Sequence, residues 1–469
     1  MLSAKSITPK KIKELAINQV VINFLLSGFF FLLFQGTANA QDNSPYSRYG
    51  IGTISPSGNI LNRGMGGIVA GYSDPLTVNF NNPASYSSFK TYLEQKSKKA
   101  ISGRVVLDAG VNFGNRSFRE GNNAEKFRSG DAYFSYIQVG IPIKQNWGLS
   151  FGIRPVSRIY YKLQRRELLL DPQTNQPIDS AVTEFKGDGG TFLPNIGTGF
   201  AIKNFSVGVN VGYMFGRKDF STRRFLFNDS VEYKNSNYET RASFGSLFFS
   251  AGVQYKINVN KLTSLTFGAF GNLEQKLKGK QDIIRETFVR DASGGDIGVD
   301  SVAVKKDIKG DIVYPAQYTI GFTVEKLPTM KTAGWLLGVD FVQTKWNNYR
   351  FYDENDEVKD NWELRIGGQF RPISAKNYFS NVAYRAGFFT GPDYVNVGNK
   401  SLNQYGISIG LGLPLANYTR LSGQYTMVNL AIEYIKRGDN SNVVKENIFR
   451  VSLGLNLSDI WFGKKKYAE

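Results

Sequence analysis

The feature that most constrains this chain is a set of long stretches in which apolar residues alternate with small or polar ones. In one stretch, residues 205–216, the apolar set is Phe205, Val207, Val209, Val211, Tyr213 and Phe215, and it alternates with Ser206, Gly208, Asn210, Gly212 and Gly216. A period of two places the apolar side chains on one face of a β-strand. The same pattern recurs at residues 147–154, 362–371, 405–415 and 449–457. The chain is therefore predicted to be all-β.

The length of these stretches separates a membrane barrel from a soluble sandwich, whose strands also have one apolar face. Each stretch runs for about ten residues, which is enough to cross a bilayer at a tilt, whereas soluble strands average about five or six. Aromatic residues lie near strand ends, as they do at membrane interfaces: Tyr213, Phe215, Tyr405 and Tyr434. The other face carries small or charged residues, which suits a crowded lumen. We therefore predict a transmembrane antiparallel β-barrel.

Fourteen stretches qualify as strands, an even number of the kind found in bacterial barrels. They are residues 104–114, 131–143, 146–163, 190–203, 205–217, 238–257, 262–276, 312–326, 333–346, 361–372, 378–390, 404–415, 419–436 and 446–458. The pattern at 219–232 is ambiguous. Two connections, 164–189 and 277–311, are polar and interleave both signs of charge, so they are predicted to be long extracellular loops.

The amino-terminal segment 1–40 is predicted to be a cleaved signal peptide. Lysines between Lys5 and Lys13 precede an apolar run at 20–34, which is shorter than the ~20 residues of a membrane-spanning helix. The sequence Ala38-Asn39-Ala40 then supplies the small residues that a signal peptidase requires. We therefore expect cleavage between Ala40 and Gln41, and export of the remaining chain.

Composition excludes several functions. The chain contains no Cys and no His, so disulfides, thiolate nucleophiles, haem ligation and His-based general bases are absent. The formal net charge is +18, yet no compact basic helix or zinc module favours nucleic acid, and anionic membrane lipids are the better partner. We expect no cofactor, no metal and no nucleic acid. Ser/Lys dyads and paired carboxylates stay open in principle, but a non-enzyme is predicted.

The segment 41–100 does not alternate and is rich in Gly, Ser, Asn and Pro. Its densest stretch contains Gly64, Gly66 and Gly67. A nucleotide-binding reading requires a preceding strand and a following helix, whereas here Asp74-Pro75 follows closely. Tight turns in a compact plug explain the glycines better, because glycine allows positive φ and close backbone approach.

At this point the sequence resembles a known family. The run Arg63 to Ala70, the tripeptide Ser73-Asp74-Pro75 and the motif Asn82-Pro83-Ala84 are similar to the amino-terminal signature of FadL-like outer-membrane barrels. The resemblance implies a fourteen-stranded barrel in the cell outer membrane that is plugged by a small hatch. It implies these boundaries: a hatch at 41–100, a barrel at 101–462 and a basic periplasmic tail at 463–469.

Several cations are predicted to face the lumen, where Arg and carboxylate side chains usually form a salt-bridged lining. Four of them, Arg154, Arg365, Arg385 and Arg450, are also candidates for holding the headgroup of a fatty-acid-like ligand, because Arg matches carboxylates bidentately. No catalytic, cofactor or metal residue is assigned.

Two functions stay open. The resemblance implies passive transport of hydrophobic or amphipathic molecules, for which a proline in a strand (Pro142, Pro155, Pro372 or Pro414) could open the wall. Prolines at strand ends would instead matter only for turns. The alternative is a non-transporting barrel that serves as a scaffold or partner subunit of an outer-membrane secretion or assembly complex. A continuous apolar pocket beside the hatch would favour transport, and a lumen filled by side chains would favour the scaffold.

Overall fold

The structure, a computed structural model, describes residues 44–461 apart from gaps at 94–99, 121–125, 228–232, 292–294, 376, 399 and 416–424. The predicted signal peptide, its cleavage point between Ala40 and Gln41, and the basic tail at 463–469 lie outside the described residues.

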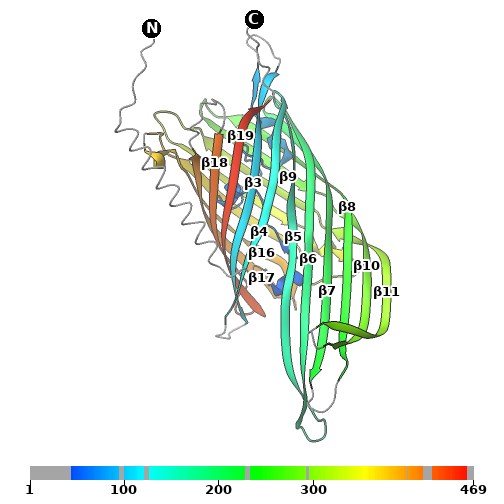
Figure 1. Cartoon of the computed structure of the whole chain (residues 1–469). Helices are drawn as coiled ribbons and strands as arrows, with labels where there is room; N and C mark the ends of the chain where they lie inside the picture. Colours follow the sequence, from blue (N-terminus) through cyan, green and yellow to red (C-terminus); the bar gives the residue numbers. More distant parts are fainter. Residues whose placement is uncertain are drawn as a thin grey trace, which may run out of the picture. The chain divides into compact units, whose positions relative to one another are not determined.

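A fourteen-stranded antiparallel barrel forms the wall (Figure 1). Its strands are β3 (Ala100–Glu120), β4 (Phe127–Lys144), β5 (Trp147–Leu170), β6 (Pro177–Ile202), β7 (Phe205–Phe227), β8 (Asn235–Asn258), β9 (Thr263–Asn272) continued by β10 (Gln275–Arg290), β11 (Asp296–Tyr314) continued by β12 (Gln317–Lys326), β13 (Gly334–Thr344), β15 (Asn361–Arg371), β16 (Ala383–Val397), β17 (Lys400–Leu415), β18 (Tyr425–Arg437) and β19 (Val444–Trp461). Each pairs with the next, and β19 pairs with β3 to close the cylinder. The predicted barrel is thus confirmed, and every predicted stretch overlaps one wall position, although residues 378–381 form a 3₁₀ helix, η4 (Tyr378–Asn381), rather than strand.

The apolar face of the alternation points outward. Along β7 the side chains of Phe205, Val209 and Tyr213 are exposed, while Ser206 and Asn210 between them are buried. In water such a surface would be costly, but in a bilayer it is the lipid-facing band of a barrel whose backbone groups are paired between neighbouring strands over most of the wall. The fold is therefore that of an outer-membrane protein. No helix among the described residues is long and apolar enough to cross a membrane.

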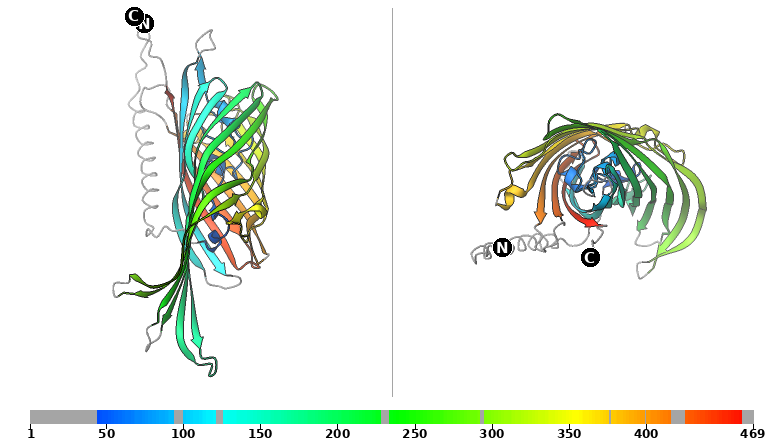
Figure 2. Two further views of the ribbon diagram at one scale, coloured as in Figure 1. Left: turned by 90° about the vertical axis from the view of Figure 1, so that its right-hand side faces the viewer. Right: turned by 90° about the horizontal axis from the view of Figure 1, so that it is seen from above.

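The prediction of two long loops is wrong. Residues 164–189 belong to the hairpin of β5 and β6, and residues 277–311 belong to the hairpin of β10 and β11. The ambiguous residues 219–227 likewise extend β7. We call the part of these hairpins beyond the cylinder, together with that of β7 and β8, the hairpin extension; Figure 2 shows it bending away from the barrel at one end. The lipid-facing band does not continue onto this part of the sheet, so its strands pair without leaving an apolar period of two. Because long hairpins of such barrels face the outside, we call the opposite end periplasmic.

Residues 44–89 lie inside the barrel, encircled by the strands (Figure 2, right), and we call them the luminal segment. They contain the 3₁₀ helix η1 (Pro45–Arg48), the strand β1 (Thr53–Ile54), the short helix α2 (Ile60–Arg63) and the 3₁₀ helix η2 (Pro83–Ser88). The short strand β2 (Thr91–Leu93) then leads into β3, and β14 (Arg350–Phe351) and the 3₁₀ helix η3 (Trp346–Asn348) lie between β13 and β15. The largest buried apolar cluster joins Tyr46 and Ile51 to the wall.

Candidate functional site

The Asn82-Pro83-Ala84 motif forms a capped turn against the wall. The Asn82 side chain accepts a hydrogen bond from the Ala84 amide and donates to the carbonyl of Ala70 at 2.8 Å. Pro83 is the first residue of η2, where its missing N–H costs nothing. Ala84 is fully buried, and Gly208 of β7 lies directly against the Pro83–Ala84 peptide. The motif therefore fixes the position of η2 in the lumen.

The glycine-rich stretch needs glycine at two positions. Gly66 and Gly67 have φ of +68° and +83°, the left-handed region that side chains disfavour. The Gly66 amide donates to Ser408 Oγ at 2.9 Å, and the stem of Arg365 packs beside Gly67. The interpretation of these residues as tight turns with close backbone approach therefore agrees with the observed geometry.

Twelve wall glycines, each on a different strand, face the luminal segment, and we call them the glycine ring. They are Gly110, Gly140, Gly148, Gly199, Gly208, Gly252, Gly268, Gly338, Gly367, Gly387, Gly410 and Gly454. A Cβ at Gly387 would collide with the backbone of Met65 and Gly66, and one at Gly268 would collide with the carbonyl of Ala70. The segment therefore packs at backbone distance around almost the whole circumference.

Buried ion pairs join the segment to the wall. Arg63, 1% exposed, is paired with Glu433 and donates to Ser452 Oγ at 2.8 Å. Arg450 reaches the same carboxylate at 3.4 Å. Such charges are stable in a low-dielectric lumen only when they are paired and hydrogen-bonded. Withdrawing the segment would remove Arg63 from Glu433, Asn112 and Ser452, and would leave Glu433 with Arg450 alone.

The start and the middle of the segment also contact charged side chains of the wall. Near its start, Ser44 Oγ donates to Glu446 at 2.7 Å, a carboxylate that also pairs with Arg116 at 2.9 Å and Arg437 at 3.2 Å. In its middle, the amides of Val69 and Ala70 donate to Asp340 Oδ2 at 2.6 and 2.9 Å. Side chains and backbone of the segment thus satisfy charged groups on β13 and β19.

The backbone pairing between neighbouring wall strands stops early between β4 and β5, and we call this place the β4–β5 seam. Pairing of β4 with β5 ends at Ile137 and Ile153. The free edge of β5 beyond that point is taken by the luminal segment, since Thr53 and Ile54 pair with Arg158 and Ser157. Ile54 is 39% exposed, so this part of the segment is not fully covered.

One of the four prolines coincides with this seam. Pro155 lies at a bulge in the β5–β6 ladder, immediately beyond the last β4 pair. Pro142 lies near the β4–β5 turn and Pro372 follows the end of β15, so they fit the turn interpretation. Pro414 pairs regularly with Met427.

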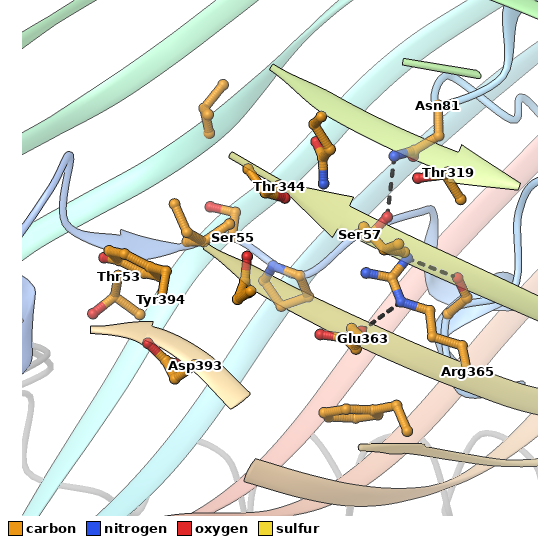
Figure 3. Close-up of a pocket in the computed structure, with 18 of the residues that line it drawn as sticks. Thr53, Ser55, Ser57, Asn81, Thr319, Thr344, Glu363, Arg365, Asp393 and Tyr394 are labelled. Atoms are coloured by element: carbon orange, nitrogen blue, oxygen red, sulfur yellow. Dashed lines mark hydrogen bonds and ion pairs between the residues drawn. The ribbon is translucent and has the colours of Figure 1, made fainter. Parts of the chain in front are cut away.

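Two cavities adjoin the segment. The inner cavity, about 260 Å³, is lined by residues 53–57 and by β12, β13, β15 and β16, and Figure 3 shows its polar side chains, including the contact of Arg365 with Glu363. Its charged lining consists of Arg63, Arg116, Arg154, Arg365, Arg437, Arg450, Glu363, Asp393 and Glu433. The periplasmic cavity, about 970 Å³, is lined by residues 71–77 and by the turns at 201–206 and 327–330.

The four predicted lumen cations divide between these cavities. Arg154, Arg365 and Arg450 line the inner cavity, whereas Arg385 lines the periplasmic one. Arg365 and Arg450 are occupied by Glu363 and Glu433. Arg154 instead lies 5.2 Å from the centroid of the Phe80 ring. The structure therefore brings three of the four together and leaves their role as ligand contacts a prediction.

Sequence reasoning did not show which side chains in this lumen pair with each other. Arg63 and Glu433 are 370 residues apart in the chain, so only the strand order and register bring them together. Tyr72 was also missed; burial raises the pKa of its hydroxyl well above its ordinary range, and it donates to Asp74. A lone Arg within a glycine-rich stretch was the one available signal for Arg63. No cluster of acidic side chains that could hold a metal occurs among the described residues.

Comparisons with known proteins agree with this geometry. A family model described as BamG matches residues 20–468. The structure is similar to that of a Pseudomonas aeruginosa FadL homologue, with a TM-score of 0.50 and 12% identity over 87% of this chain and 99% of that one. It is similar to the same degree (TM-score 0.50, 12% identity, 86% and 99% covered) to a deltaS2S3 mutant of TodX, a monoaromatic hydrocarbon channel. No curated protein sequence matches the chain. The resemblance to FadL-like barrels is thus confirmed at the level of the fold.

Proposed function

We propose that this chain, a member of the BamG family, is a non-transporting outer-membrane barrel. The family model spans the luminal segment and the barrel together. The role of the chain is that of a scaffold or partner subunit in an outer-membrane secretion or assembly complex. The observation that carries the proposal is the filled lumen, in which the glycine ring and the buried ion pairs hold the luminal segment against nearly every strand.

A passage for hydrophobic molecules needs an apolar path, and the lining of the inner cavity does not resemble one. Six arginines and three carboxylates face that cavity of about 260 Å³. Moving an apolar molecule through it would place the molecule against charged groups, most of which form ion pairs. Opening a wider path would break the Arg63–Glu433 pair, which would leave Arg63 without its counterion and Glu433 with Arg450 alone.

The hairpin extension supports a role in partner binding. Its outer strand, β11, is exposed along residues 296–307, and the described residues of the chain provide no partner strand on its far side there. Exposed apolar side chains such as Leu168 and Val302, 68% and 74% exposed, lie on the extension beyond the lipid-facing band. Unpaired edges and exposed apolar side chains are surfaces on which other chains dock.

The test is the native mass of the full chain extracted from outer membranes in mild detergent. The proposal expects an assembly that contains other chains. Trimming the β10–β11 hairpin, by joining Asp282 to Lys306 through an Asn-Gly turn, should release them while the barrel stays folded. Trimming the β5–β6 hairpin between Gln164 and Glu184 removes Leu168 but leaves the edge of β11 in place, so it separates the contribution of the apolar side chains from that of the free edge. A lone chain from wild-type membranes would contradict the proposal.

Passive transport of hydrophobic or amphipathic molecules is the second candidate, and the β4–β5 seam is the observation that favours it. There Ile54 is partly exposed where the wall ladder ends, next to the inner cavity that Ile54 also lines. The fold is shared with a hydrocarbon channel. If the chain transports, vesicles that contain it should admit toluene or a fatty acid faster than empty vesicles. Sealing the seam should then abolish the difference.

The proposal includes no catalysis. The inward carboxylates Glu363, Asp393 and Glu433 are each paired with an arginine, so they are neutralised in place rather than available as acid and base. The absence of an enzymatic activity is a prediction, which assays of the purified protein against lipids and peptides would check.

A further inference from the structure

Four cations gather on neighbouring strands at the extracellular end of the barrel. Lys445 of β19 lies directly opposite Arg119 of β3 in the antiparallel ladder, and Lys126 immediately precedes β4, the next strand of the wall. Lys436 of β18 lies opposite Asn447, two residues along β19 from Lys445. Figure 1 shows β18, β19 and β3 side by side. We call Arg119, Lys126, Lys436 and Lys445 the cation cluster; together they line a pocket of about 480 Å³.

The cluster faces outward, at the end of the lipid-facing band. On β18, Lys436 has the parity of the exposed Tyr434, and on β19, Lys445 has the parity of the exposed Phe449. Arg119 lies on the same face, because residues directly opposite each other in a ladder point to the same side. Tyr434 and Phe449 are themselves directly opposite each other, on the membrane side of the cluster. The cations therefore begin where the aromatic residues of the membrane interface end.

No carboxylate of the described residues forms an ion pair with the cluster. Lys445 Nζ donates to the amide oxygen of Asn440, which is neutral. Asp439 lines the same pocket, but its Oδ1 accepts from the amide and the hydroxyl of Ser441 at 2.8 and 2.6 Å. The lining thus has four cations against one carboxylate, which leaves three positive charges in excess.

The facing cations differ from the way charges are placed elsewhere on this sheet. Like charges directly opposite each other destabilise a pair of strands, whereas opposite charges stabilise it. On the hairpin extension, Lys278 and Asp311 are directly opposite and form an ion pair at 3.1 Å. Arg119 and Lys445 have the same relation in the ladder, yet both are cations. An anion bound between them would turn this repulsion into attraction.

We infer that the cation cluster binds the phosphate group of a lipid in the outer leaflet. A guanidinium such as that of Arg119 matches phosphate oxygens bidentately, and lysine ammonium groups add charge. Ser117 and Asn447 line the same pocket and supply neutral hydrogen-bond donors. The acyl chains would lie against Tyr434 and Phe449, which is why a lipid fits better than a soluble anion. The net charge of the chain predicts only general attraction to membranes, whereas this cluster defines one place and one chemical group.

The site does not depend on the proposed function, because it is measured on the purified full chain alone. Native mass spectrometry in detergent would titrate the chain with lipid A that carries two phosphate groups, with the same lipid after removal of both phosphates, and with inorganic phosphate. We expect the phosphorylated lipid to bind at least about tenfold more tightly than the dephosphorylated one, since only the first forms charge-assisted hydrogen bonds. Inorganic phosphate should bind more weakly than the phosphorylated lipid, because it lacks the acyl contacts.

Substitution separates the site from general attraction to a cationic barrel. Arg119→Gln/Lys445→Gln should weaken binding of the phosphorylated lipid about 10- to 100-fold. The unfolding midpoint should not fall, because two facing like charges are removed. Lys305→Gln/Lys306→Gln removes the same charge from exposed positions on the hairpin extension and should change the affinity less than about twofold. Heat-modified migration of each variant on gels checks that the barrel is folded. Equal affinity for the two lipids, equal loss in the two variants, or inorganic phosphate bound as tightly as the phosphorylated lipid would overturn the inference.

Discussion

The luminal segment and the hairpin extension of the same barrel use charged residues in opposite ways. In the lumen, Arg63 is buried against Glu433, a residue 370 positions away in the chain. In the extension, Arg217 and Asp188 pair on neighbouring strands while 59% and 42% of their side chains are exposed. The first arrangement fixes one part of the chain inside another. The second keeps a sheet soluble while leaving its edges and apolar side chains accessible to partners.

The largest expected difference between the two regions is the loss of unfolding free energy when a paired arginine is replaced. Arg63→Met should lower the free energy of unfolding by about 3–5 kcal/mol, because it removes one partner from a buried cluster and strands Asn112 and Ser452 as well. Arg217→Met should change it by less than about 1 kcal/mol. Urea unfolding of both variants in lipid vesicles, followed by tryptophan fluorescence, measures the difference. Equal effects would show that the lumen is not the fixed region.

Replacing a glycine of the glycine ring should also destabilise the protein more than replacing one in the extension, but by less than the loss of Arg63. Gly387→Val places a side chain against the backbone of Met65 and Gly66, so we expect a loss of about 2–3 kcal/mol, typical of overpacking. Gly298→Val, on the extension, meets only a carboxylate oxygen of Glu286 at 3.8 Å and should change stability by less than about 0.5 kcal/mol. The same unfolding measurement applies. A tolerated Gly387→Val would mean that the segment moves aside easily.

The extension should respond in binding rather than in stability. Replacing Leu168 and Val302 by Ser removes exposed apolar surface, so the unfolding midpoint should shift little. The fraction of the chain recovered in the larger assembly should fall, and Leu163→Ser on the same sheet, only 38% exposed, gives a graded control. Unchanged recovery would place the partner surface elsewhere.

The smallest effect concerns the turn of the β5–β6 hairpin. The amides of Gln173 and Thr174 donate to Asp171, which lowers the pKa of this carboxyl below its ordinary value. The turn is therefore stabilised above the unfolded pKa of about 3.9, and this stabilisation is lost as the pH falls through the folded value. Hydrogen exchange of the Gln173 amide should accelerate over that range, and in Asp171→Ala it should be fast throughout.

Sequence reasoning identified the wall because its period of two is imposed by lipid on one side. From Phe205 to Phe215 every second side chain faces the bilayer, so every second residue in the sequence is apolar. In the extension that constraint vanishes, and β11 between Asp296 and Asp307 was taken for loop although it pairs with β10 along most of this length, with three register shifts. Propensity without an apolar face is a weak signal for a strand.

The candidate site was predictable only in part, for a related reason. Arg154, Arg365, Arg385 and Arg450 were assigned to the lumen from their parity along strands, and the structure places all four there. Which of these arginines is paired with a carboxylate depends on the alignment of strands and segments that are far apart in the chain. That Glu363 pairs with Arg365 while Arg385 meets only amides could not be read from either local pattern.

The central claim is that the luminal segment stays in place while the protein works, and a cross-link tests it most directly. Ile54 and Ser157 face each other across the antiparallel β1–β5 pair, where Cα atoms are close enough for a disulfide, and the chain has no other cysteine. Cells would carry Ile54→Cys/Ser157→Cys as their only copy, oxidised or reduced. We predict that the native assembly is recovered in full in both states. Loss of the assembly on oxidation, with recovery on reduction, would contradict the account.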